Sequence, residues 1–542
     1  MKKAAMALMV FGAMIFWLPM LADPYMTSRL LLVALGAAGL LMTKSERASS
    51  MEVPSLLMAA VAIISAVFAA DWRYAIIGSY QSGMDSLIAF VCYSCVVFAA
   101  ARSGETVDDV ARMVSVASIP VSLYGIFQRF FHDPLIWSDL HYGLRISSSQ
   151  GGPIFLGAVM SLSILCSIHL AKKGDKLAWA ALAVGLPCLW FTQTRGAMLA
   201  TAAGAAIMSR WTMFAFIPAL VMMPRMLASG TSDIARFEVW KIALKVFADN
   251  PLLGYGPGNF YLAFRRYAGL GMVGAAKTAA YAQAHAHNDI LHVAATMGLI
   301  GLTAYALLGC SALWIAWKHA ERRFLFALLA AYAVLSSFNP VTASAFVVLA
   351  LIFGVASSRK IGAPERCLPL ALASVAVFLA VGRLTLADYH YARGGLAKSD
   401  PATSAMEFQR AAKLNPWEMF YSCKQVDSLV RLIPYMPLEQ RRPLALAARQ
   451  LAAKAVERHP LDSYAHELLG KQILIGYIAG FRDIAPAKAL DEFNKAQEYA
   501  PTFETLMWRR LATAKELGAS AQAWLADKDI SELHRASGKG GV

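Results

Sequence analysis

Long apolar runs, each able to cross a lipid bilayer, recur along most of this chain. The hydrocarbon core of a bilayer is about 30 Å thick, and a helix of roughly 20 apolar residues crosses it with its backbone groups paired. With 58% hydrophobic and only 16% charged residues, the sequence excludes an ordinary soluble globular protein. We therefore predict an all-α polytopic membrane protein with about 12–13 transmembrane helices. The predicted spans lie near residues 4–21, 28–42, 54–70, 83–101, 108–131, 153–171, 177–192, 196–209, 211–227, 287–317, 323–337, 340–357 and 368–386.

Basic residues in the connections predict which side of the membrane each connection faces. Lys and Arg gather in alternate gaps, as cytoplasmic loops require, so we predict a cytoplasmic N-terminus and an exterior location for everything after residue 387. The short run at 196–209 is critical, because every later orientation would invert if it only dipped into the membrane. The same bias, with contact to anionic lipid head groups, accounts for most of the net charge of +15. We find no basic stripe with interleaved aromatic residues, so we expect no nucleic acid partner.

The chain changes character after residue 387, where charge rises and alanines recur at helical spacing. Three blocks each predict an amphipathic helix that ends before a proline, at Pro416, Pro460 and Pro501. They resemble degenerate tetratricopeptide repeats, since the spacings of 44 and 41 residues between these prolines exceed the usual length of about 34. Such a region predicts a docking surface for a protein partner; a cap that stabilises the membrane domain is the alternative. The predicted domains are 1–386 in the membrane, 387–535 as an exterior helical-repeat domain and 536–542 as a flexible tail.

A polar cluster stands at the exterior start of the span near 287–317. It contains His285, His287, Asn288 and Asp289. A histidine at a membrane–water boundary can exchange a proton with solvent, and its ordinary pKa suits general acid/base chemistry. Metal binding through His285, His287, Asp289 and His292 is the alternative. Residues two apart face different sides of a helix, however, so a shared metal would require an irregular backbone here.

The exterior loop from 228 to 286 is positively charged, against the orientation bias. Its stretch 233–248 has the apolar periodicity of a helix that lies on the bilayer surface or packs over the spans. Three glycines, at 254, 256 and 258, follow in a predicted tight turn, whose backbone N–H groups could approach an anion; a plain turn fits equally well. A positive exterior loop beside a membrane favours an anionic lipid-linked substrate, because arginine binds phosphate oxygens bidentately.

Three sequence blocks resemble, in order, the O-antigen ligase and polymerase superfamily, which also includes bacterial protein O-oligosaccharyltransferases. The blocks are FTQTRGAMLA at 191–200, RFEVWKIALKVFADNPLLGYGPGNF at 236–260 and HAHNDIL at 285–291, within a likeness that covers roughly residues 60–355. The resemblance implies an all-helical glycosyltransferase of the C type in the bacterial inner membrane, working without nucleotide sugar, metal or other cofactor. It implies transfer of a glycan from undecaprenyl pyrophosphate to an acceptor in the periplasm, which would be the exterior side.

The resemblance maps catalytic roles onto Arg195, Arg236 and His287. The two arginines would hold the donor pyrophosphate, and the histidine would activate the acceptor hydroxyl as a general base. Fixed cations that stabilise the charge of the leaving pyrophosphate can suffice without a metal. Weaker candidates, for orienting the histidine or for contacting the phosphate or the glycan, are His285, Asn288, Asp289, Arg265, Arg266 and Arg145. The simpler alternatives are an arginine that anchors the end of its span and a histidine that caps a helix.

The sequence leaves the acceptor open among lipid A core, a second lipid-linked glycan and a protein side chain. A histidine base of ordinary pKa predicts activity that falls as the pH drops through neutrality. Two other classes of function are a transporter or flippase for the same lipid and a noncatalytic assembly scaffold. A transporter should place polar groups at mid-membrane around broken helices, whereas the polar clusters here lie at the predicted exterior ends.

Overall fold

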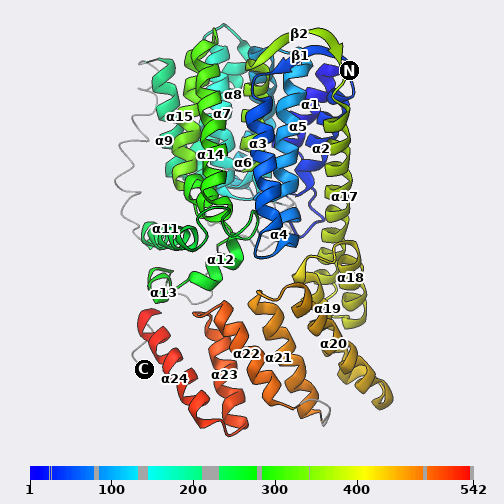
Figure 1. The fold of residues 1–542 in the computed structure, drawn as a ribbon. Coiled ribbons are helices and arrows are strands. Elements are labelled where there is room, and N and C mark those ends of the chain that lie inside the picture. The colour runs from blue at the N-terminus through cyan, green and yellow to red at the C-terminus, as the bar shows by residue number, and fades with distance from the viewer. Residues whose placement is uncertain are drawn as a thin grey trace.

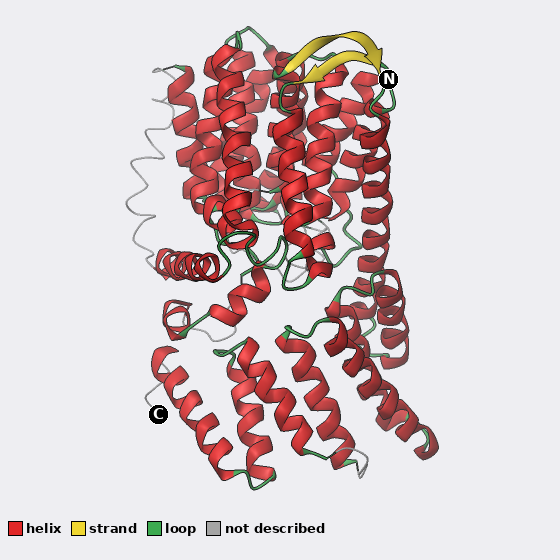
Figure 2. Cartoon of the chain, viewed as in Figure 1, coloured by secondary structure: helices red, strands yellow, loops and turns green. Residues whose placement is uncertain are grey.

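The computed structural model of the protein describes residues 1–23, 25, 27–78, 85–131, 133, 144–209, 231–276, 283–340, 342–479 and 485–537. Figures 1 and 2 show an upright bundle of helices with a row of further helices at one end. Within these ranges the structure is helical except for one pair of short strands, which confirms the predicted all-α class.

Twelve of the thirteen predicted spans correspond to helices of the bundle. These are α1 (Lys2–Met14), α2 (Thr27–Leu41), α3 (Glu52–Val67), α5 (Leu87–Ser103), α6 (Val107–Phe130), α7 (Pro153–Ala171), α8 (Lys176–Thr192), α9 (Arg195–Met208), α14 (Asp289–Lys318), α15 (Arg322–Phe338), α16 (Ala343–Ala356) and α17 (Leu368–Leu396). The predicted span at 211–227 lies outside the described residues. Among the helices that are described, α6, α7, α14 and α17 are long and apolar enough to cross a membrane by themselves, and shorter apolar helices accompany them. The chain is therefore a polytopic membrane protein.

Helix α7 occupies the middle of the bundle, and nearly all of its residues are buried. It is apolar all round, as expected of a helix surrounded by others. Two of its serines, Ser163 and Ser167, donate to the carbonyl oxygens of Val159 and Ser163 at 2.9 and 2.8 Å, and the Ser167 hydroxyl also lies 2.8 Å from that of Ser115 in α6. At Gly157 a Cβ atom would lie 2.9 Å from the Ala197 Cβ, so the glycine allows α7 to approach α9 closely.

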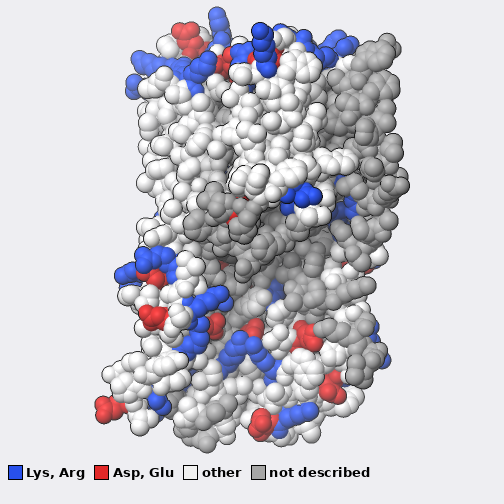
Figure 3. Space-filling view, turned by 180° about the vertical axis from the view of Figure 1, so that it is seen from behind, with Lys and Arg blue, Asp and Glu red and all other residues white. Residues whose placement is uncertain are grey.

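The basic connections gather at one end of the bundle. Figure 3 shows Lys and Arg concentrated there, above a mostly uncharged band. Lys172, which follows α7, donates to the Met208 carbonyl at the end of α9 (2.9 Å), so α9 runs the full distance to this end although it is short. Helix α9 is therefore long enough to reach from one end of the bundle to the other, while the predicted orientation of the chain stays a prediction.

The same end carries the two strands, which the sequence did not predict. Strand β1 (Ser45–Ser49) pairs antiparallel with β2 (Ser358–Glu365), with a register shift between Ser45 and Arg47. Because β1 follows α2 and β2 precedes α17, the pair ties together two segments far apart in the sequence (Figure 1).

Helix α14 is broken at Gly298, whose φ of 63° and ψ of −159° are not helical. The segment 251–256 fills the break. The N–H groups of Tyr255 and Gly256 donate to the carbonyls of Ala295 and Thr296 (2.8 Å each), and those of Leu299 and Ile300 donate to the carbonyls of Pro251 and Leu252 (2.8 and 3.2 Å). Backbone groups that the break releases from α14 are thus paired again, as the interior of a membrane requires.

The last bundle helix continues into the C-terminal region without interruption. Helix α17 runs through the predicted boundary at 386–387 and ends at Leu396. The helices that follow each pack against the next in chain order, side by side in Figure 1. They are α18 (Pro401–Leu414), α19 (Met419–Leu432), α20 (Leu438–Arg458), α21 (Ser463–Ile478), α22 (Ala487–Tyr499), α23 (Glu504–Glu516) and α24 (Ser520–Ser537).

The three proline blocks have equivalent structures. Helices α18, α20 and α22 each end just before the proline of their block. Ala411, Ala455 and Ala496, five residues before the three prolines, are all buried. Phe408 and Phe493, eight residues before theirs, each lie against a glycine of the neighbouring helix, where a Cβ atom would be 2.7 Å from the ring. These matching contacts describe a helical repeat; its identity as a tetratricopeptide repeat stays a prediction.

A buried polar contact joins the C-terminal helices to the bundle. Asp71, the N-cap of α4 (Trp72–Ile77), accepts a hydrogen bond from His459 Nδ1 at 2.6 Å, and both side chains are almost fully buried. Tyr74 stacks on the His459 ring, with centroids 4.8 Å apart. The backbone of Asp71 also exchanges two hydrogen bonds with the Asn259 amide, at 3.1 and 3.0 Å. Asp71 therefore links the C-terminal region and α4 to Asn259, just beyond the segment that fills α14.

We expect Gly298→Ala to lower stability by roughly 1–3 kcal/mol, because its Cβ atom would lie 2.3 Å from the Leu252 carbonyl oxygen in a backbone conformation that disfavours side chains. The measurement is thermal unfolding of the purified protein in detergent. Gly309→Ala is the matched control, since it lies in the same helix and a Cβ atom there meets nothing within 4 Å. Equal melting temperatures for the two variants would contradict this account of the break.

Candidate functional site

Three segments distant in sequence meet at the C-terminal end of α15. They are the first residues of α9, helix α11 (Thr231–Asp249) and the loop 283–288. The contacts bring Gly196 against Asn339, the Asn288 amide against the Ser337 carbonyl (3.3 Å), and the Trp240 ring against Phe338 (centroids 6.5 Å apart). The same three segments carry Arg195, Arg236 and His287. The fold therefore gathers the three predicted catalytic residues around one helix end, on the side of the bundle that bears the C-terminal helices (Figure 1).

Helix α11 forms as predicted and lies across the end of the bundle (Figure 1). One face, with Val239, Ala243 and Val246, is fully buried, while Phe237 and Leu244 are more than half exposed. The helix thus packs over the spans with one face and keeps a second apolar face outward. Arg236 is half-buried between these two faces, close to the loop 283–288.

Arg195 is the first residue of α9, and the turn before it is held by other side chains. Gln193 ends α8 with a left-handed backbone (φ 51°). Arg145 donates to the Thr192 carbonyl (2.9 Å) and to the Thr194 hydroxyl (3.2 Å). The Thr194 hydroxyl in turn donates to the Pro153 carbonyl (3.0 Å) and does not cap α9. The partial positive charge of an uncapped helix N-terminus therefore adds to that of Arg195.

His287 has an unusual backbone and a defined ring orientation. Its φ of 56° is left-handed. Its ring Nε2 lies 2.9 Å from the Gln283 side-chain oxygen, which can only accept, so Nε2 carries the proton and Nδ1 carries the lone pair. Nδ1 is buried and has no hydrogen-bond partner among the residues that the structure describes. An imidazole nitrogen with a free lone pair is the form that a general base requires.

The surroundings of His287 favour its neutral form. Burial, then the positive charge of Arg236 and the nearby His292, lower its pKa to about 4. The pKa of His285 is lowered well below its ordinary value by burial and by the other two histidines. The sequence-based expectation of a base that titrates near neutrality is therefore wrong for the unliganded protein, because it assumed a solvent-exposed ring.

The polar residues next to His287 make hydrogen bonds to other groups of the protein. Asn288 is the N-cap of α14, where its side-chain oxygen accepts from the Leu291 N–H (3.0 Å). His285 Nδ1 accepts from the His287 N–H (2.9 Å), and its Nε2 lies 3.4 Å from Asp289 Oδ1. The Tyr332 hydroxyl donates to Asp289 Oδ2 at 2.9 Å. These contacts suit residues that position His287.

The predicted metal cluster has a different composition in the structure. Asp85, His285 and His292 bring one potential ligand atom each within 4.8 Å of one another, without His287 or Asp289. The Nδ1 atoms of both histidines accept backbone N–H groups, from His287 at 2.9 Å and Ala286 at 3.4 Å, so each neutral ring carries its proton on Nε2. The two rings are also stacked, 3.9 Å apart at an angle of 18°, so their in-plane lone pairs would not converge. The donor set therefore fits a metal ion poorly.

A second group, Asp108, His169 and Glu321, lies at the basic end of the bundle. Here Lys173 Nζ lies 2.7 Å from a carboxylate oxygen of both Asp108 and Glu321. The lysine occupies the position that a cation would take, so this group is an ion-pair network.

Two of the predicted arginines face the C-terminal helices. Arg265, in α12 (Phe260–Tyr267), is buried, donates to the Tyr261 hydroxyl (3.0 Å) and lies over the rings of Tyr464 and Phe503, 3.9 and 4.7 Å from their centroids. Arg266 has Tyr255 as a hydrogen-bond partner, which raises the pKa of its guanidinium group. The structure does not bring either residue to the end of α15 in any described contact.

The glycine turn does not present a row of N–H groups to a ligand. The N–H groups of Gly254 and Gly256 donate to the carbonyls of Asn250 and Thr296, at 3.1 and 2.8 Å. Gly258 is required for close approach, since a Cβ atom there would lie 2.4 Å from the Tyr74 carbonyl oxygen. Of the two interpretations of this segment, an anion-binding turn and a plain turn, the structure supports the plain turn.

The sequence did not single out Gln283, Asp85 or Tyr332. Gln283 lies only four residues from His287, so a search for a partner of the ring could have found it. Asp85 lies just before α5 and Tyr332 lies in α15, and nothing in the sequence relates either residue to the histidines.

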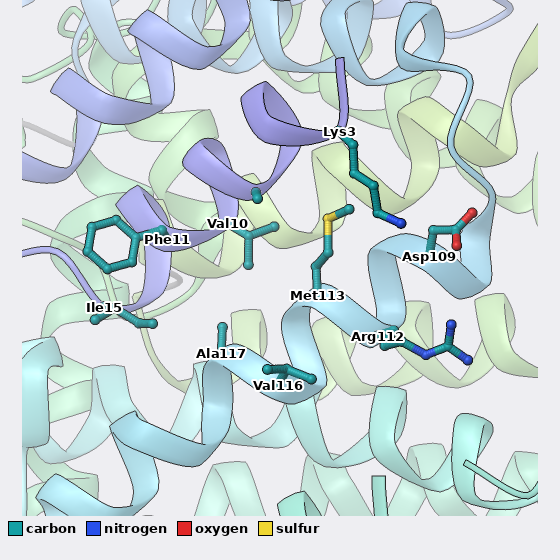
Figure 4. A pocket seen from close by; sticks show the side chains of 10 residues that line it. Lys3, Val10, Phe11, Ile15, Asp109, Arg112, Met113, Val116 and Ala117 are labelled. Carbon is teal, nitrogen blue, oxygen red and sulfur yellow. The ribbon is translucent and has the colours of Figure 1, made fainter. Parts of the chain in front are cut away.

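A groove of about 340 Å³ between α1 and α6, lined mainly by apolar residues with Lys3, Asp109 and Arg112, contains none of the predicted site residues (Figure 4).

We expect Arg265→Met to loosen the C-terminal region. The variant removes a buried cation from the faces of Tyr464 and Phe503, and such contacts contribute about 2 kcal/mol when desolvated. The measurement is limited proteolysis, which should cut the C-terminal helices faster. Lys245→Met, at an exposed position of α11, is the control. Equal rates of cleavage in the two variants would contradict this role of Arg265.

One segment of the chain matches a known family. Residues 142–306 match the family model described as O-Antigen ligase. The match spans all nine predicted site residues and the three quoted blocks, and it confirms the predicted resemblance to the O-antigen ligase superfamily. No curated protein matches the chain. The family match and the membrane-spanning helices together support a bacterial membrane protein with a general role in glycan transfer.

Proposed function

We propose that this chain, a membrane protein with an O-antigen ligase segment at residues 142–306, transfers a glycan from undecaprenyl pyrophosphate to an acceptor hydroxyl. One observation carries the proposal. A buried imidazole whose Nδ1 lone pair has no partner among the described residues lies close to Arg236, and Arg195 approaches the same helix end. The orientation that we predicted places this site at the periplasmic face of the inner membrane, together with the C-terminal helices.

The proposed reaction is a single displacement at the anomeric carbon of the donor sugar. His287 Nδ1 takes the proton of the acceptor hydroxyl while the acceptor oxygen bonds to that carbon. The bond from the carbon to the pyrophosphate oxygen breaks, and its electron pair leaves with undecaprenyl pyrophosphate. Arg195, Arg236 and the N-terminus of α9 stabilise the negative charge that the pyrophosphate gains.

Donor binding should strengthen the base. In the unliganded protein, burial and then the positive charge of Arg236 hold the pKa of His287 down. A pyrophosphate bound to Arg236 neutralises that positive field, so the pKa of His287 should rise when the donor is present. The base would then accept a proton most readily when a substrate is in place.

His285, Asn288 and Asp289 act in this proposal by holding the loop 283–288, and Arg145 by holding the turn before Arg195. Arg265 and Arg266 support the contact with the C-terminal helices. The protein partner predicted for those helices, and the choice among lipid A core, a lipid-linked glycan and a protein side chain as acceptor, stay predictions.

The break in α14 favours one alternative, because transporters use discontinuous helices to bind substrates at mid-membrane. In this chain the released backbone groups that the structure describes are paired with segment 251–256, which leaves them no role in binding an ion or a substrate. A transfer assay in detergent separates the classes, since no second compartment exists. Absence of product with all three acceptor classes would favour a transporter or a scaffold.

We expect Arg195→Ala and Arg236→Ala each to lower glycan transfer by roughly a hundredfold or more while the protein still folds and inserts. Lysine at either position should restore activity only in part, because it lacks the bidentate fork of arginine. The assay uses purified protein, donor lipid and acceptor, with and without EDTA, which should have no effect. Lys241→Ala, an exposed position on α11, is the control. Normal glycan transfer by an alanine variant would show that this arginine does not bind the donor and only anchors its helix.

The pH dependence should report two different states of His287. Its pKa of about 4 in the unliganded protein predicts that kcat/KM for the donor stays level from pH 7 to about 5 and falls as the pH drops through about 4, where the base becomes protonated. The groups that face the ring are Arg236 and His292, with His285 beside it. Because the donor offsets Arg236, kcat should fall at a higher pH than kcat/KM. His287→Ala should be inactive but still bind the donor, and coincident acid limbs would contradict the proposed coupling.

A further inference from the structure

We propose that Tyr332, Asp289 and His285 form a chain of positioning residues that aims His287. The inference rests on the proposed function and adds a residue, Tyr332, that the sequence did not indicate. Its elements come from three places: the loop 283–288, the first turn of α14 and the middle of α15.

The three positioning residues act by holding the backbone of His287. A φ of 56° is uncommon for a residue with a side chain, and it persists only where surrounding contacts hold it. The contact that holds it is the His287 N–H, which donates to His285 Nδ1 at 2.9 Å. This hydrogen bond requires that His285 carry its ring proton on Nε2 and keep Nδ1 free to accept.

The Asp289 carboxylate selects that proton position. Its Oδ1 lies 3.4 Å from His285 Nε2, outside hydrogen-bond geometry, and the negative charge of the carboxylate favours the form in which that nitrogen carries the proton. The stacked His292 ring, 3.9 Å away, keeps the His285 ring from turning over. Asp289 therefore acts on His287 through His285, without a described contact to the His287 ring.

Two tyrosine hydroxyls hold the carboxylate in turn. Tyr332 donates to Asp289 Oδ2 at 2.9 Å, so it must accept from Tyr305, whose hydroxyl lies 2.7 Å away. Asp289 is 4% exposed, and a buried carboxylate with this set of partners has little freedom to rotate. The chain from Tyr305 through Tyr332, Asp289 and His285 thus ends at the N–H of the catalytic residue.

The sharpest test replaces His285 with two amides of different reach. Asparagine places a side-chain oxygen near the Nδ1 position, where it can accept the His287 N–H. Glutamine reaches toward the Nε2 position and leaves that N–H without an acceptor. We expect His285→Asn to keep activity within about fivefold of the unchanged protein, and His285→Gln to lower kcat by about a hundredfold with little change in donor KM.

The same pair of variants separates the alternatives. A metal or substrate bound through Nε2 would make His285→Gln the more active of the two, and a role in packing alone would make them equal; either result would overturn the inference. Tyr332→Phe should lower kcat about tenfold at unchanged donor KM, with the exposed Tyr435→Phe as the matched control. An unchanged kcat for Tyr332→Phe would remove Tyr332 from the chain.

His287→Ala and the unchanged protein are assayed in parallel. If the unchanged protein transfers no glycan to any acceptor, the proposed function fails. If it does and His287→Ala is inactive, while the His285 variants do not differ in the expected order, only the positioning chain fails.

Discussion

The pairing of segment 251–256 with the break in α14 is the interaction on which the arrangement of the site depends. A helix interrupted inside a membrane exposes backbone N–H and C=O groups that lipid cannot bond, and each such group costs several kcal/mol. The segment from Pro251 to Gly256 supplies partners for four of them. Helix α14 begins directly after the loop that carries His287. The segment paired with it leads into α12, and Asn259, just before α12, bonds to Asp71 at the start of α4. The pairing therefore connects the site to α12 and to α4. Glycine is needed at 254 and 298, where the two backbones come within contact distance.

Burial shapes the chemistry of the site in a second way. A histidine near an arginine and two other histidines would be an unfavourable cluster if all were charged, but burial keeps His285 and His287 neutral. Both neutral rings carry their proton on Nε2. The Nδ1 lone pair of His285 accepts the His287 N–H, whereas Gln283 holds the proton of His287 on Nε2 and leaves its Nδ1 open. The hydrogen bonds of the surrounding backbone and side chains, more than any shift of a single group, determine which nitrogen can act as a base.

The parts of the structure that the sequence predicts are those encoded locally. Apolar runs locate twelve described helices, and the prolines at 416, 460 and 501 mark the ends of α18, α20 and α22. Motifs likewise located the three segments that meet at α15. What escapes prediction depends on long-range contact: the strand pair between residues 45–49 and 358–365, and the hydroxyl of Tyr332 on Asp289. The pKa of His287 was misjudged because burial and Arg236 act through space. Arg265 was expected near the phosphate because its charge is visible in sequence while the ring of Tyr464 that covers it is not.

The position of the break in α14 also bears on how the chain is made. Segment 251–256 precedes α14 in the sequence, so it leaves the ribosome first. When the two parts of α14 emerge, the partner for their exposed backbone is already present, separated from α14 by α12 and the residues up to the loop that carries His287. Helix α14 can therefore enter the membrane as an apolar stretch and afterwards bend around segment 251–256, which has already been synthesised. A circular permutation that moved segment 251–256 behind α14 would reverse this order and leave the broken helix without its partner during insertion.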